Sequence, residues 1–145
     1  MGQLNYKKVR DNVPTPEYKT EGSAGFDLHA MIDYSFTLYS GASILIPTGI
    51  AIELPDNSFE GQVRPRSGLA CKFGVTVVNS PGTVDSDYRG EIKVGLINLS
   101  NTAYEIQPLD RVAQLVICHI YPCILQEVKE LSSTERGGNG FGSTD

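Results

Sequence analysis

Three side chains suited to acid–base chemistry or to contact with a sugar lie close together in one run: Asp85, Asp87 and Tyr88. In an extended backbone, Asp85 and Asp87 would point to the same side. A carboxylate beside a phosphate can activate an attacking water, and a tyrosine ring offers a flat apolar face to a sugar or a base. The run therefore predicts hydrolysis of a phosphate compound, although an ordinary Asp-rich turn also fits these residues taken alone.

A second candidate is the run from Arg64 to Gly68, which leads into an expected short helix over residues 67–73. Ser67 is a suitable N-cap, and Gly74 is a natural place for the helix to end. Free amide groups at a helix start, together with the forked guanidinium of Arg66, suit phosphate oxygens. A turn with a solvated arginine is the simpler alternative.

Two further segments carry polar groups that could face a ligand. Gln114 alternates with apolar neighbours, so it points into a site or to the surface of the protein. The glycine-rich segment from Ser132 to Asp145 cannot build a core, and we expect a flexible lid over residues 132–145 beside a folded domain over residues 1–131. Its glycines could wrap phosphates and Phe141 could stack on a base, while a disordered tail without a function is the alternative.

Composition narrows the possible functions. The 145 residues fit one domain, and the formal net charge of -5 argues against stable binding of nucleic acid. No apolar run is long enough to span a membrane, and the polar start of the chain does not resemble a secretory signal. We therefore expect an intracellular protein, cytoplasmic or nuclear, whose three cysteines are reduced and buried. The only two histidines lie far apart in sequence, which disfavours a zinc site or a Ser-His-Asp triad.

Short β-branched stretches separated by turn residues predict an all-β sandwich or barrel. We expect strands at residues 26–30, 43–54 in two pieces, 59–63, 75–78, 91–98, 111–120 and 124–128.

Together and in order, these motifs resemble those of the trimeric dUTP diphosphatase (dUTPase) family. The matching segments are residues 24–28 (AGFDL), 65–70 (PRSGLA), 82–90 (GTVDSDYRG), 110–115 (DRVAQL) and the glycine-rich tail at 136–144. The resemblance implies a β jelly roll that forms a homotrimer with shared active sites. It also implies hydrolysis of dUTP to dUMP and pyrophosphate, which limits uracil in DNA and supplies dUMP for dTMP synthesis.

The resemblance also implies a role for individual residues. Asp85 would activate the attacking water, and Tyr88 would pack on the deoxyribose and exclude a 2′-hydroxyl. The uracil would be read by the backbone from Asn79 to Gly82, with Val84 in the same pocket. A second subunit would hold the phosphates through Arg66, Ser67, Gly68 and Gln114, and Asp27 would support Arg66. A third would close the site with Arg136, Phe141, Gly142, Ser143 and Thr144. Mg²⁺ would bind through the triphosphate and water, without a direct protein ligand.

The chain departs from the family pattern at two positions. Leu109 stands where the fourth motif usually has glycine, and we expect it to alter the turn there, because leucine disfavours a positive φ. Asp145 stands where the fifth motif usually ends in glycine, which adds negative charge near the phosphates. Two other functions remain open on sequence grounds: a dCTP deaminase of the same fold, and a trimer that binds nucleotide or protein without catalysis.

Overall fold

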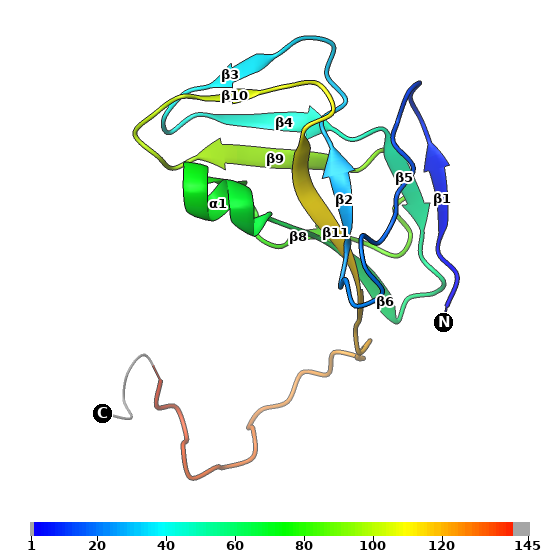
Figure 1. The fold of residues 1–145 in the computed structure, drawn as a ribbon. Helices are drawn as coiled ribbons and strands as arrows, with labels where there is room; N and C mark the ends of the chain where they lie inside the picture. Colours follow the sequence, from blue (N-terminus) through cyan, green and yellow to red (C-terminus); the bar gives the residue numbers. More distant parts are fainter. Residues whose placement is uncertain (1, 141–145) are drawn as a thin grey trace.

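The computed structural model describes residues 2–140 as an all-β fold with one short helix (Figure 1). In chain order, the elements are β1 (Asn5–Lys8), β2 (Phe26–His29), β3 (Phe36–Leu38), β4 (Ser43–Pro47), β5 (Ile50–Glu53), β6 (Phe59–Arg64), α1 (Ser67–Phe73), β7 (Val75–Val77), β8 (Gly82–Val84), β9 (Lys93–Asn98), β10 (Tyr104–Ile106) and β11 (Arg111–His119).

The strands form two main antiparallel sheets and two smaller ladders. One main sheet has the order β2-β11-β6-β8 and the other the order β4-β9-β7, while β1 pairs with β5 and β10 pairs with β3. The core is made of aliphatic side chains from both main sheets, among them Leu28, Val63 and Leu115 from the first and Ile46 and Leu96 from the second. Burial of these side chains is the main favourable contribution to the stability of the fold.

Alternation along the strands decides which side chains enter the core. In β2, Phe26 and Leu28 are buried, whereas Asp27 and His29 face outward. In β11, Leu115 is fully buried and Gln114 is not, so Gln114 lies on the outer face. Successive side chains of a strand point to opposite faces of the sheet. The local sequence pattern is therefore enough to place apolar residues in the core and polar residues on the outer face.

Most of the predicted strands are confirmed, with ends that differ by one or two residues. Pro47 and Gly49, on either side of Thr48, lie where residues 43–54 divide into β4 and β5, as predicted. The sequence did not reveal four strands, β1, β3, β8 and β10, each of which has only three or four residues. Such short strands show little alternation, and the equally short β7 could be predicted because Val75, Thr76 and Val77 are all β-branched.

The predicted helix is present, but its N-cap is not the one expected. Ser67 is the first helical residue, and the N-cap is Arg66, which makes no side-chain capping hydrogen bond. Gly74 ends the helix in the left-handed region at φ 67°, as its type predicts. A β-carbon there would lie 2.8 Å from that of Ser100, so the position needs glycine for space as well as for conformation.

The turn before β11 keeps a positive φ in spite of its leucine. Leu109 has φ 66°, and its amide donates to the carbonyl of Ala30 at 2.8 Å. The amide of Gln107 donates to Oδ2 of Asp110 at 2.8 Å and closes the turn. Leucine thus adopts the left-handed conformation at this turn, at the cost of backbone strain.

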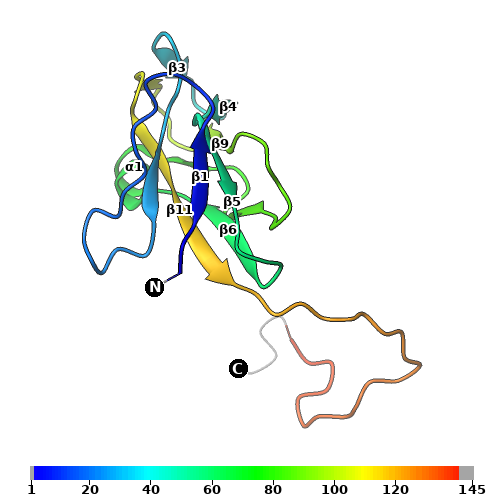
Figure 2. The same cartoon turned by 90° about the vertical axis from the view of Figure 1, so that its right-hand side faces the viewer.

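Residues 120–140 form no helix or strand and leave the sandwich from the end of β11 (Figures 1 and 2). The predicted strand at 124–128 is wrong, because within residues 2–140 no strand pairs with this segment. Ile124 and Leu125 are almost fully exposed, at 98% and 95%. The segment therefore presents apolar side chains that no other part of the described chain covers.

The three cysteines are unpaired, as expected, but they are not buried. Cys71 and Cys123 are exposed, and Cys118 is partly exposed on the outer face of β11. No helix within residues 2–140 is long and apolar enough to cross a membrane.

Candidate active site

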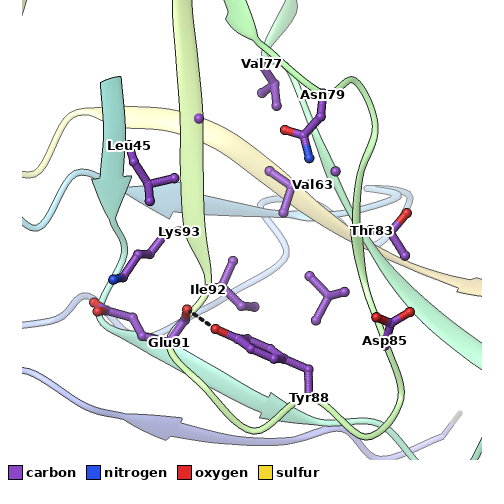
Figure 3. Close-up of a pocket in the computed structure, with 13 residues that line it drawn as sticks. Leu45, Val63, Val77, Asn79, Thr83, Asp85, Tyr88, Glu91, Ile92 and Lys93 are labelled. Carbon is purple, nitrogen blue, oxygen red and sulfur yellow. Dashed lines mark hydrogen bonds between the residues drawn. The ribbon is translucent and has the colours of Figure 1, made fainter. Parts of the chain in front are cut away.

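A pocket of about 310 Å³ opens between β8 and β9 (Figure 3). Its floor is apolar and buried, made by side chains that include Val63, Val77, Val84 and Ile92. Its rim is polar and exposed, with Asn79 near one end and the loop that bears Asp85 and Tyr88 near the other. This combination of an apolar floor and a few polar groups is typical of a small-molecule site.

Gly82 lines the pocket at a point where only a small residue fits. It is the first residue of β8 and pairs with Val63 of β6. A β-carbon on Gly82 would lie 3.3 Å from that of Val63 and 3.2 Å from Nδ2 of Asn79. Any larger side chain would therefore crowd both the pocket floor and Asn79.

The acidic run forms a turn and not a continuation of the strand. β8 ends at Val84, and the amide of Tyr88 donates to the carbonyl of Asp85 at 3.1 Å. The predicted common direction of Asp85 and Asp87 relied on an extended backbone and is not realised. Asp85 lines the pocket, whereas Asp87 is exposed outside it.

Tyr88 is fixed on the pocket rim by its hydroxyl. The phenol donates to the carbonyl oxygen of Glu91 at 2.9 Å (Figure 3). A β-carbon on Gly90 would lie 2.4 Å from the tyrosine oxygen, so only glycine leaves room for the ring in this position. Tyr88 is 45% exposed and lines the pocket, so a ligand there could contact it.

The sequence did not single out Glu91 or Lys93, which also line the pocket. Both carboxylate oxygens of Glu91 accept from Arg10, at 2.6 Å and 3.1 Å, and Oε1 also accepts from the amide of Gly49 at 2.8 Å. The hydrogen bonds from Arg10 are the largest cause of a lowered pKa of Glu91. Arg10 and Glu91 are far apart in the sequence, so no local sequence pattern indicates their ion pair.

Gln114 lies on the opposite face of the same sheet from the pocket. Gln114 of β11 pairs with Asp27 of β2 on one side and with Arg64 of β6 on the other. Residues that pair across neighbouring strands share a face of the sheet. Nε2 of Gln114 donates to the carbonyl of Pro65 at 3.1 Å. Val63 of β6 and Gly82 of β8 are buried and line the pocket, whereas Gln114 lies on the other face of this sheet.

Arg66 is held on this outer face by a shared carboxylate. Its Nε donates to Oδ1 of Asp27 at 3.0 Å, and Nη1 of Arg111 donates to Oδ2 at 3.2 Å. Nη1 of Arg66 also donates to the carbonyl of Arg111 at 3.1 Å. The contact between Asp27 and Arg66 that the resemblance implied is thus present, with a second arginine on the same carboxylate.

The remaining predicted site residues are not at the pocket. Ser67 and Gly68 are exposed in the first turn of α1, and Arg136 is exposed in the tail, where its Nε donates to the carbonyl of Asn139 at 2.8 Å. Phe141, Gly142, Ser143, Thr144 and Asp145 lie outside the described residues. The structure therefore brings Asn79, Gly82, Val84, Asp85 and Tyr88 together and leaves the other described candidates elsewhere.

The pocket has little positive charge of its own. Asp85, Glu91 and Lys93 are the charged residues that line it. Within residues 2–140, no group of three or more histidine, cysteine or acidic side chains is arranged to hold a metal ion. A polyphosphate bound here needs cations from outside the pocket.

Comparison with known proteins identifies the family. The dUTPase family model matches residues 11–145. The deoxyuridine 5'-triphosphate nucleotidohydrolase of Fusobacterium nucleatum is 53% identical over 145 residues, which cover 99% of each chain. The enzyme of the same name from Neorickettsia sennetsu is 56% identical over 129 residues, covering 89% of this chain and 86% of the relative.

A solved structure agrees with these sequence matches. The dUTPase of Staphylococcus bacteriophage 80alpha with dUPNHPP aligns with a TM-score of 0.89 and 25% identity, covering 100% of this chain and 99% of the other. The expected all-β fold of this family is thereby confirmed. This chain belongs to the dUTPase family.

Proposed function

We propose that this chain hydrolyses dUTP to dUMP and pyrophosphate in the pocket between β8 and β9, with Asp85 directing the attacking water. The observation that carries the proposal is the position of Asp85 on the rim of an apolar pocket, on the same short turn as Tyr88. A carboxylate in hydrogen-bond reach of a water can orient it and accept its proton as it attacks the α-phosphorus.

The far end of the pocket is suited to a pyrimidine edge. The backbone from Asn79 to Gly82 would exchange hydrogen bonds with uracil, and Asn79 adds a side-chain amide on the rim. Cytosine presents a reversed donor and acceptor pattern, which would leave buried polar groups unpaired at about 1–3 kcal/mol each. The tight packing around Gly82 and Val63 would oppose the methyl group of thymine.

The sugar would lie between the pyrimidine end and Asp85. Tyr88 would cover one face of the deoxyribose and leave no room for a 2′-hydroxyl, and Val84 would form the apolar surface beneath it. The hydrogen bond from Tyr88 to Glu91 keeps the ring from turning away.

The triphosphate would be bound by residues of two neighbouring subunits in a homotrimer. Two observations support this arrangement. Among the described residues, Lys93 is the one cationic side chain that lines the pocket, and Arg66 and Gln114 lie on the outer face of the sheet beside Asp27. One neighbour would supply Arg66, Ser67, Gly68 and Gln114. The other would supply Arg136 and the segment from Phe141 to Thr144, delivered by the uncovered tail that follows β11.

Mg²⁺ would accompany the triphosphate. The acidic lining of the pocket fits a cation that is held by phosphate oxygens and water, which is the usual way in which Mg²⁺ binds nucleotides. When bound, the ion would offset phosphate charge. The protein residues that would face it through water are Asp85 and those that hold the phosphates.

The proposed reaction would limit uracil in DNA and supply dUMP for dTMP synthesis. Free thiols at three partly or fully exposed cysteines favour an intracellular location, where thiols stay reduced.

Release of pyrophosphate from dUTP, dCTP, dTTP and UTP, with and without Mg²⁺, tests the proposal. We expect release from dUTP in preference to the other three nucleotides. Ammonia produced from dCTP would instead indicate a deaminase. Binding of dUTP without release of pyrophosphate would indicate a non-catalytic trimer.

A further inference from the structure

Glu91 connects three separate parts of the chain. Its carboxylate accepts two hydrogen bonds from Arg10 and one from the amide of Gly49, and its carbonyl accepts the hydroxyl of Tyr88. We refer to Glu91, Arg10, Gly49 and Tyr88 as the Glu91 clasp. The N-terminal segment, the turn between β4 and β5 and the pocket rim thus meet at one residue.

The surroundings of Glu91 hold it in one place. Its side chain is 15% exposed, whereas that of Arg10 is 45% exposed. The next residue, Ile92, donates its amide to the carbonyl of Ile50 at 2.8 Å, and its own carbonyl accepts the hydroxyl of Thr48 at 2.6 Å. Hydrogen bonds of the backbone and of side chains therefore hold residues 91 and 92 in place. This segment includes the Glu91 carbonyl that accepts the hydrogen bond from Tyr88.

Gly49 makes the clasp possible from the other side. It has φ 69°, which favours glycine, and a β-carbon there would lie 2.3 Å from Val13. Its carbonyl accepts from the amide of Val9 at 2.8 Å, which brings the N-terminal segment alongside the turn. Arg10 follows directly, so this pairing delivers its guanidinium to Glu91.

Tyr88 has only one described side-chain hydrogen bond, and its acceptor belongs to the clasp. Gly90 gives the ring just enough room, and no helix or strand contains residues 85–92. The position of the ring therefore depends on the position of the Glu91 carbonyl. A shift of about 1 Å in a group that contacts the substrate can reduce catalysis by about a hundredfold.

We infer that Arg10 and Glu91 are positioning residues that set the preference for a deoxyribose over a ribose by holding Tyr88 through the Glu91 clasp. The inference rests on the proposed function of Tyr88 as the group that excludes the 2′-hydroxyl. Arg10 reaches neither sugar nor phosphate in this role. Its influence passes through the carboxylate and then the carbonyl of Glu91.

The first test measures the ratio of kcat/KM for dUTP to kcat/KM for UTP. Arg10→Ala and Glu91→Gln should each lower this ratio about tenfold, with Arg10→Lys between them and the unmodified protein. Lys19→Ala is the matched control, since it removes an exposed ion pair with Glu17 that does not line the pocket. An unchanged ratio in Arg10→Ala would overturn the inference.

A double-mutant cycle separates positioning from general destabilisation. Tyr88→Phe removes the hydroxyl that donates to Glu91, so it should lower the same ratio, and adding Arg10→Ala should have little further effect. Effects that simply add would contradict a route through Tyr88.

Hydrogen–deuterium exchange of the free protein tests the clasp without nucleotide. Arg10→Ala should increase exchange in residues 85–92, and Lys19→Ala should not. Absent turnover of dUTP by the unmodified protein would refute the proposed function, yet the exchange result would still decide whether the clasp orders the Tyr88 segment. Unchanged exchange would overturn the clasp whatever the substrate.

Discussion

The pocket between β8 and β9 and the outer face around Gln114 differ in how completely one chain assembles them. In the pocket, residues 79–91 fold back on themselves, so Asn79, Gly82 and Asp85 reach one cavity. On the outer face, Arg66 and Gln114 come from distant segments, and both lie beside Asp27 of β2, away from that cavity. In the proposed function, residues of one chain would therefore supply the groups for the base, the sugar and the water, whereas the groups for the phosphates would come from a second surface.

Replacement of Asp85 tests the pocket side most strongly. Asp85→Asn should keep the fold and nucleotide binding but reduce turnover by about 10²–10⁴-fold, because the amide cannot accept the proton of the water. The assay is steady-state release of pyrophosphate from dUTP. Asp87→Asn is the matched control, since Asp87 lies on the same turn outside the pocket. Near-normal turnover of Asp85→Asn would exclude it as the base.

Removal of the tail tests the other side of the comparison. Deletion of residues 135–145 should leave a folded trimer with little activity, because the described part of this segment, residues 135–140, contributes no residue to the core. Light scattering would give the oligomeric state and circular dichroism the fold. Normal turnover by the shortened protein would show that the tail is not a lid.

Substitution of Gly90 tests whether the packing around Tyr88 limits activity. Gly90→Ala places a methyl group about where the Tyr88 hydroxyl lies, so the ring must leave its bond to Glu91. We expect kcat/KM for dUTP to fall about tenfold or more. Gly22→Ala is the control, because a β-carbon there meets nothing within 4 Å. Equal activity of the two variants would mean that the Tyr88 ring can move without loss of function, contrary to its proposed role.

The smallest effect concerns the turn that leads into the outer-face strand. Leu109→Gly should raise the free energy of unfolding by about 0.5–1 kcal/mol, because it relieves a left-handed leucine that is half exposed. Urea denaturation measures the change. Leu99→Gly is the control at an exposed turn leucine without a positive φ, and it should be neutral or destabilising. A loss of stability in Leu109→Gly would contradict strain at this turn.

The sequence predicted those parts of the fold that depend on local pattern. Alternation identified β2 and β11, and Gly74 marked the end of α1. The strand predicted at residues 124–128 was wrong because β-branched residues form a strand only when another strand pairs with them. The N-cap was placed one residue late, because the backbone carbonyl of Arg66 accepts the first helical hydrogen bond, from the amide of Ala70 at 3.0 Å.

The same distinction applies to the candidate site. Asp85, Tyr88 and Gly82 belong to one run, so a motif could reveal them. Glu91 could be found only from the fold, because its partners Arg10 and Gly49 are distant in sequence. Only the arrangement of the strands in space brings them beside Glu91.

Mixing two inactive chains tests the division of the site between subunits most directly. Full-length Asp85→Asn would be unfolded and refolded together with the otherwise unmodified chain that lacks residues 135–145. In a one-to-one mixture, about a quarter of the sites should receive Asp85 from one chain and a tail from another, and turnover of dUTP should recover to that fraction. A mixture of Asp85→Asn with a shortened Asp85→Asn chain should remain inactive. If the first mixture also remained inactive while mixed trimers had formed, each chain would have to build its site alone, and the proposed sharing would be wrong.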